Sequence, residues 1–312
     1  MKSPRASLAA LLGAQAQVTF TDCAAKFMLI ALAQQLAKGQ GMDAKPVVSL
    51  IATILIAPYV LFGPVCGWLS DRFAKRTVLN VALGLQVALM GLLTGAIAAH
   101  SFVASLVCFF LLSVQAAIFA PAKRGILLEY AGSVHLSRYV GFMEMLNVTA
   151  ILVGTVAGGG LFSHWLSAGG DPWSASCKVA LALTGCAVAG WAVFQVAAPT
   201  TAQSATKFSA ALWVRHFTDA SEVWRERPLW RATMGICFFY GIGGYILLLL
   251  PQVAFELEHG GVRTGAVASV MAGALGVGTL FGNLFAGLVS RRGVELGLAP
   301  LGGLMLAVVL LL

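Results

Sequence analysis

Two charged residues four positions apart in an otherwise apolar stretch are the first in this chain whose spacing allows chemistry. Asp22 and Lys26 follow Gln15 and Thr19 at a 4-3-4 spacing, which places all four side chains on one face of a helix. Charges at membrane depth are costly and normally face a protein interior or a wet cavity. One interpretation is that Asp22 binds the ammonium and Lys26 the phosphate of a zwitterionic head group. The alternative is a structural ion pair between the two side chains.

A second polar patch holds Glu144 and Asn147, which share a helical face with Ile151, Gly154 and Gly158. The polar end of this face continues into a seam of small residues, along which another helix can approach closely. Glu144 is therefore a candidate for substrate contact or for proton coupling. The alternative is a glutamate at the cytoplasmic end of a helix that extends to the membrane interface.

The elements that must carry these residues are apolar helices. The chain has 312 residues, of which 59% are hydrophobic and 10% charged, and its mean hydropathy is +0.88. Apolar runs of about 20 residues, the length that spans a bilayer, recur along it. The sequence predicts an all-α, polytopic membrane protein with helices near 8–37, 47–69, 78–98, 101–121, 139–162, 178–198, 231–255 and 265–289, and a ninth from about 297 to the last residue.

The basic residues lie mainly between the apolar runs and on alternate sides of the predicted membrane. The formal net charge is +8, but a nucleic-acid partner would need a basic face on a soluble domain, and we expect none. Fifteen Lys and Arg residues fall on one side, four fall on the other, and Lys26 lies inside the first run. Because cytoplasmic loops are enriched in these residues, the N-terminus is expected in the cytoplasm.

The longest polar stretch follows the sixth run and mixes charged residues with tryptophans, which suits a segment lying on the cytoplasmic leaflet. We therefore expect a six-helix bundle over 1–198, a central cytoplasmic loop over 199–230 and an incomplete second bundle over 231–312. Two multi-helix bundles joined by a central loop are typical of transporters.

The sequence gives little support for a metal site, a disulfide framework or enzymatic chemistry. The six cysteines are scattered without a CxxC pair, so neither a zinc site nor a disulfide framework is expected. HExxH and GxSxG motifs are absent, as are paired aspartates in facing runs. We expect no enzyme activity, no metal and no cofactor. Lys123 and Arg124 close one helix on the cytoplasmic side, where they anchor the helix or contact lipid phosphates.

The loop between the second and third runs carries a dense charge cluster. It resembles the signature loop of the major facilitator superfamily at Gly67, Leu69, Asp71, Arg72, Lys75, Arg76 and Leu79. Asp71 and the basic residues can join oppositely charged helix ends as a conformational latch, for which Gly67, Asp71, Arg72, Lys75 and Arg76 are the candidates. The alternative is that the basic residues only set orientation. Ala74 stands where the family usually has glycine, so the turn here is expected to avoid left-handed backbone.

Two further stretches, 120–129 and 141–159, resemble the bacterial lysophospholipid transporter branch of this superfamily. The resemblance implies twelve helices, of which eight or nine are present, so the chain looks C-terminally truncated. It also implies a substrate such as lysophosphatidylethanolamine, moved to the inner leaflet of the bacterial cytoplasmic membrane by alternating access, and a separate acyltransferase that acts on it there. Asp22 matches the first residue of an Asp-Asn pair in the family's first helix, but Cys23 replaces the Asn.

Two other functions stay open beside lysolipid transport. One is a proton-coupled exporter of small solutes or drugs, in which Asp22 or Glu144 titrates. The other is a truncated, non-functional transporter.

Overall fold

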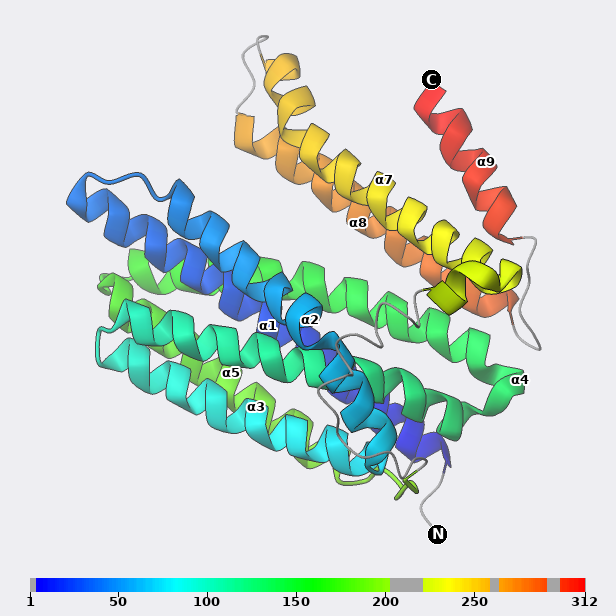
Figure 1. Cartoon of the computed structure of the whole chain (residues 1–312). Helices are drawn as coiled ribbons and strands as arrows, with labels where there is room; N and C mark the ends of the chain where they lie inside the picture. The colour runs from blue at the N-terminus through cyan, green and yellow to red at the C-terminus, as the bar shows by residue number, and fades with distance from the viewer. Residues whose placement is uncertain (1–3, 203–220, 259–263, 291–297, 312) are drawn as a thin grey trace. The chain divides into compact units, whose positions relative to one another are not determined.

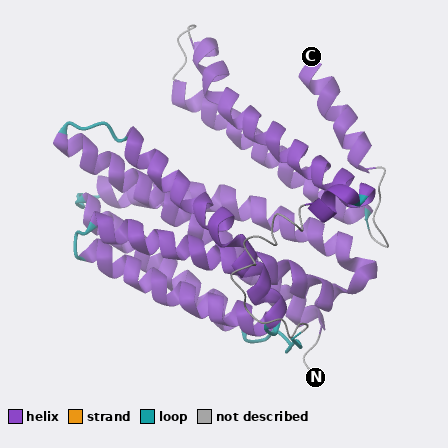
Figure 2. Cartoon of the chain, viewed as in Figure 1, coloured by secondary structure: helices purple, strands orange, loops and turns teal. Residues whose placement is uncertain are grey.

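The computed structural model describes residues 4–202, 221–258, 264–290 and 298–311. Within these ranges every regular element is an α-helix and no strand occurs (Figure 2). This confirms the all-α prediction. The helices are α1 (Pro4–Gln40), α2 (Lys45–Arg72), α3 (Lys75–Ala98), α4 (Phe102–Ser167), α5 (Pro172–Phe194), α7 (Arg227–Glu258), α8 (Thr264–Val289) and α9 (Leu298–Leu311).

The five helices α1 to α5 are each long and apolar enough to cross a membrane, judged by length and composition. Each of α1 to α4 contains at least one of the apolar runs expected from the sequence, and α5 covers most of the run expected at 178–198 but ends at Phe194. The chain is therefore a polytopic helical membrane protein, as predicted. Of the expected central loop over 199–230, residues 203–220 lie outside the described residues.

The helix α4 contains two of the expected spans. Its 66 residues would extend for about 100 Å at 1.5 Å per residue, roughly three times the thickness of a bilayer core. A break at Gly132, with φ 67° and ψ 166°, divides it, and the chain reverses direction within α4 (Figure 1). Glycine suits this position because left-handed backbone costs it nothing. The stretches expected at 101–121 and 139–162 thus lie in the two arms of α4, and the residues between them are helical apart from the break.

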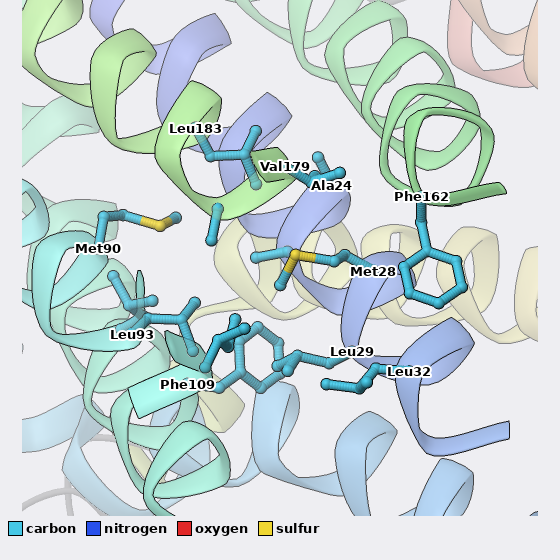
Figure 3. Packing of buried hydrophobic residues seen from close by; sticks show 14 of the residues in the cluster. Ala24, Met28, Leu29, Leu32, Met90, Leu93, Phe109, Phe162, Val179 and Leu183 are labelled. Atoms are coloured by element: carbon cyan, nitrogen blue, oxygen red, sulfur yellow. The ribbon is translucent and has the colours of Figure 1, made fainter. Parts of the chain in front are cut away.

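One buried cluster joins α1, α3, α4 and α5, and Ile51 of α2 also belongs to it. Met28 and Leu29 of α1 pack with Leu93 of α3, Phe109 of α4 and Leu183 of α5 (Figure 3). In a bilayer the lipid tails are as apolar as these side chains, so close packing and dispersion stabilise the contact more than exclusion of water does.

A second buried cluster lies nearer the N-terminal end of α1 and again joins α1, α3, α4 and α5. Leu11 of α1 packs there with Leu79 of α3, Phe119 and Ile126 of α4, and Phe194 of α5. Together the two clusters make α1, α3, α4 and α5 one bundle, which belongs to the first of two compact units, Met1–Thr206 with Leu280–Leu312. The second unit is Lys207–Thr279 and contains α7.

Candidate functional site

A polar network connects α1 with the second arm of α4. The Gln15 Nε2 donates to Thr19 Oγ1 at 3.1 Å and to Asn147 Oδ1 at 2.9 Å. The Thr19 hydroxyl donates to the same Asn147 oxygen at 2.8 Å. In turn Asn147 Nδ2 donates to Glu144 Oε2 at 3.4 Å. The two polar patches expected from the sequence, one on each helix, therefore meet in the fold.

The Asp22 carboxylate lies one turn beyond Thr19 on the same face of α1. Its Oδ1 is buried and has no hydrogen-bond partner. A buried carboxylate oxygen without a partner is costly, because water no longer solvates it and no donor replaces the water. Such an atom is suited to accept a hydrogen bond from a bound ligand or from water.

Lys26 does not neutralise Asp22 in this structure. Its Nζ lies over the ring of Phe27, 4.6 Å from the centroid, and the two side chains form no ion pair within 4.0 Å. In the described part of the chain the only such pair is formed elsewhere, by Lys75 and Glu129. The structural ion pair considered as an alternative for Asp22 and Lys26 is therefore absent from this conformation.

The cation that acts on both carboxylates is Lys123. This half-buried residue of the first arm of α4 lies close enough to Glu144 and Asp22 to interact electrostatically with both. Its neighbour Arg124 is exposed. Sequence reasoning gave both residues the same role at a helix end, whereas the structure separates them: Lys123 is near the acidic residues and Arg124 is not buried.

Two glycines of α4 bring its second arm against the backbone of α1 beside Asp22. A Cβ at Gly154 would lie 2.6 Å from the carbonyl oxygen of Phe20, and one at Gly158 would meet the carbonyl oxygen of Ala24 even more closely. Only glycine allows this approach. The predicted small-residue seam is therefore the contact between α4 and the part of α1 that carries Asp22.

The charged loop between α2 and α3 forms a second site, built around Lys75. This side chain is only 4% exposed, and its Nζ lies 2.7 Å from Glu129 Oε1 on α4. It passes directly over Gly125, where a Cβ would lie 2.5 Å from Lys75 Cε. The ion pair joins the start of α3 to the first arm of α4.

Arg76 binds the chain where it leaves α5. Its Nε donates to the carbonyl oxygen of Ala197 at 3.0 Å, and its backbone N–H donates to Thr200 Oγ1 at 3.0 Å. Tyr130 donates to the carbonyl oxygen of Ala198 at 2.5 Å. A cation at the carbonyl end of a helix interacts favourably with its dipole, so Arg76 holds the end of α5 against α3.

The remaining candidate latch residues lie at the end of α2. Arg72 is its last residue and is half-buried, whereas Asp71 is exposed. A Cβ at Gly67 would contact nothing within 4 Å in the described part of the chain. The turn avoids left-handed backbone at Ala74, with φ −56° and ψ 121°, as the departure from glycine led us to expect.

A comparison with known protein families identifies the family of this chain. The model of the Major Facilitator Superfamily matches residues 17–312. The chain belongs to the major facilitator superfamily. Transport, not enzymatic chemistry, is the activity to which membership points, and no group of three or more His, Cys, Asp or Glu that could hold a metal occurs among the described residues.

Relatives in this superfamily agree with the branch expected from the sequence. The chain is 32% identical over 229 residues to the lysophospholipid transporter LplT of Escherichia coli O7:K1, an alignment that covers 72% of this chain and 54% of the relative. It is 30% identical over 228 residues to LplT of Salmonella heidelberg, with 72% and 53% covered. The chain thus spans about half the length of these relatives.

Several contacts at these two sites could not be found from the sequence. Glu129, Tyr130 and Thr200 received no role because their partners are 54 to 124 residues away along the chain. The central position of Lys123 was also missed. A single lysine at the end of an apolar run carries no signal that distinguishes an anchor from a member of a charge cluster.

Proposed function

We propose that this superfamily member moves lysophospholipids, with lysophosphatidylethanolamine as the representative substrate, to the inner leaflet of a bacterial cytoplasmic membrane. The observation that carries the proposal is the buried, unpartnered Asp22 oxygen, which lies on the same helical face as a polar network and in electrostatic range of a lysine. The names of the LplT relatives support the lipid substrate.

The chemistry of the site suits a head group that carries both charges. An ammonium would find acceptors in Asp22 and Glu144, and a phosphate would find a cation in Lys123. Lys26, which is not paired with Asp22, is a second candidate for the phosphate, and Asn147 orients Glu144. Charged groups that are not paired with one another at this depth are more consistent with binding than with a purely structural role.

Transport would proceed by alternating access between a bundle over 1–198 and one over 231–312. Lys75 and Arg76 make their contacts within α3, α4 and α5, so they would keep the first bundle rigid while it moves. The exposed Asp71 is the latch residue available for contacts that change with state. The count of basic residues supports a cytoplasmic N-terminus. A separate acyltransferase would act on the delivered lipid.

The test is uptake of labelled lysophosphatidylethanolamine into spheroplasts of a strain that lacks its own lysophospholipid transport. The chain should restore uptake, and Asp22→Asn should lower it about tenfold or more. Asp43→Asn is the matched control, because Asp43 is an exposed residue between α1 and α2. Uptake equal to that of the empty strain, with the chain present in the membrane, would reject the proposal.

A further inference from the structure

At the α1 end of the polar network, every donor hydrogen of Gln15 Nε2 and Thr19 Oγ1 is used in a hydrogen bond. Gln15 Nε2 donates one hydrogen to Thr19 Oγ1 and the other to Asn147 Oδ1. The Thr19 hydroxyl donates its own hydrogen to Asn147 Oδ1. The amide nitrogen of Gln15 and the hydroxyl of Thr19 therefore use all their hydrogens within the network, and Asn147 Oδ1 accepts two bonds.

This arrangement leaves Asn147 only one orientation. If its amide were flipped, its nitrogen would face the Gln15 amide nitrogen and its oxygen would face the Glu144 carboxylate. Both encounters are repulsive, so the amide nitrogen must point to Glu144 Oε2, as it does at 3.4 Å. Hydrogen bonds thus run in one direction, from Gln15 and Thr19 on α1 through Asn147 to Glu144 on α4.

The orientation of Gln15 has a cost that a packing role does not explain. Gln15 is 1% exposed, and its Oε1 is buried without a hydrogen-bond partner. An apolar residue of similar size would avoid this penalty. Two hydrogen bonds from the amide nitrogen, one to Thr19 and one to Asn147, offset this penalty.

We propose that Gln15 and Thr19 are positioning residues that act through Asn147 to hold the Glu144 carboxylate in its binding orientation. This inference rests on the proposed function, since it requires that Glu144 contacts the transported head group. Neither Gln15 nor Thr19 needs to touch the substrate for this role. The network also joins α1 and the second arm of α4 at the site, so Glu144 and Asp22 keep a fixed separation.

The first experiment replaces the Thr19 hydroxyl. Thr19→Val keeps the shape and removes both the hydrogen bond to Asn147 and the one that Thr19 accepts from Gln15. Uptake should fall about threefold to tenfold through a higher KM, because the Asn147 amide that holds Glu144 loses one of its two donors. Thr19→Ser restores the hydroxyl and should recover most of the uptake. The matched control is Thr184→Val, which removes a half-buried hydroxyl that bonds Thr94 Oγ1 at 3.1 Å between α5 and α3, away from the network.

The second experiment is a double-mutant cycle with Glu144→Gln. If Thr19 acts through Glu144, Thr19→Val should have little further effect on uptake in the Glu144→Gln background, whereas Thr184→Val should have the same effect in both backgrounds. Equal, independent losses from Thr19→Val in both backgrounds would overturn the inference. So would a Thr19→Ser variant as impaired as Thr19→Val.

An infrared measurement separates this inference from the proposed function. The carboxylate band of Glu144, identified by its loss in Glu144→Gln, should shift in purified Thr19→Val protein and return in Thr19→Ser. A shift without any lysolipid uptake by the unmodified chain would reject the substrate and keep the positioning network. Uptake by the unmodified chain with no band shift in Thr19→Val would reject the positioning role alone.

Discussion

The glycine seam between α4 and α1 offers the sharpest test of the described packing. A Cβ at Gly158 would meet the carbonyl oxygen of Ala24 and would also lie 2.8 Å from its carbonyl carbon and its Cα. All three are backbone atoms, so no rotamer change can relieve the clash and the two helices must separate. By contrast, a Cβ at Gly159 or Gly160 would contact nothing within 4 Å.

The expected effect of Gly158→Ala on stability is the cost of the steric clash minus the gain in helix propensity. Overpacking a well-packed contact costs about 1–3 kcal/mol, and rigid backbone neighbours place this site at the upper end. Alanine returns about 0.5–1 kcal/mol relative to glycine inside a helix. The net loss in the free energy of unfolding is about 2 kcal/mol, which lowers the melting temperature by about 3 °C for a chain of this size.

The assay is thermal unfolding of the purified full chain in detergent, with Gly159→Ala as the matched control. The control has no backbone clash and keeps only the gain in helix propensity, so it should raise the melting temperature by about 1–2 °C. Uptake should also fall in Gly158→Ala, because the displaced part of α1 carries Asp22. Indistinguishable melting temperatures for the two variants would refute the close approach of α4 and α1 on which the site is built.

Three further predictions follow from the charged sites. Asp22→Asn should leave the melting temperature unchanged or raised, because it removes a buried unpartnered carboxylate, while uptake falls about tenfold or more; a lowered melting temperature would indicate a structural role. Lys75→Met should cost about 2–3 kcal/mol in the free energy of unfolding by denaturant, less than a fully buried pair because the Glu129 side chain is 22% exposed. Gly125→Ala should displace Lys75 and have no additional effect in a Lys75→Ala background, where the atoms that a Cβ at 125 would meet are absent. Arg76→Lys should cost about 1 kcal/mol by losing the bond to the Ala197 carbonyl, and an unchanged melting temperature would exclude that bond.

Much of the helical architecture could be predicted because bilayer length and apolar composition act locally. The expected runs near 47–69 and 78–98 correspond to α2 and α3. That residues 122–138 are helical apart from the break at Gly132 could not be predicted in this way. Residues there are polar enough to leave the membrane, but helix formation depends on backbone hydrogen bonds and continues regardless of the surrounding solvent.

The sequence predicted the polar face of each helix at the candidate site, but not that the two faces meet. The spacing of Gln15, Thr19 and Asp22 was enough to place them on one face of α1, since the helical period is fixed. That Asn147 supplies the partner, 128 residues beyond Thr19, was not predictable. The spacing of Asp22 and Lys26 allowed an ion pair, but Lys26 lies over Phe27 instead, because spacing limits reach and does not choose the rotamer.

The sequence alone determined the class of this protein, the helical faces that carry its polar residues and the loop that marks its superfamily. These features depend on composition and on periods of a few residues. Only the tertiary structure decided which faces meet, that Lys123 lies in electrostatic range of Asp22 and Glu144, and that Lys75 and Arg76 hold helices of one bundle. The physical reason is that helix packing brings together residues more than fifty positions apart, and no local pattern records that contact.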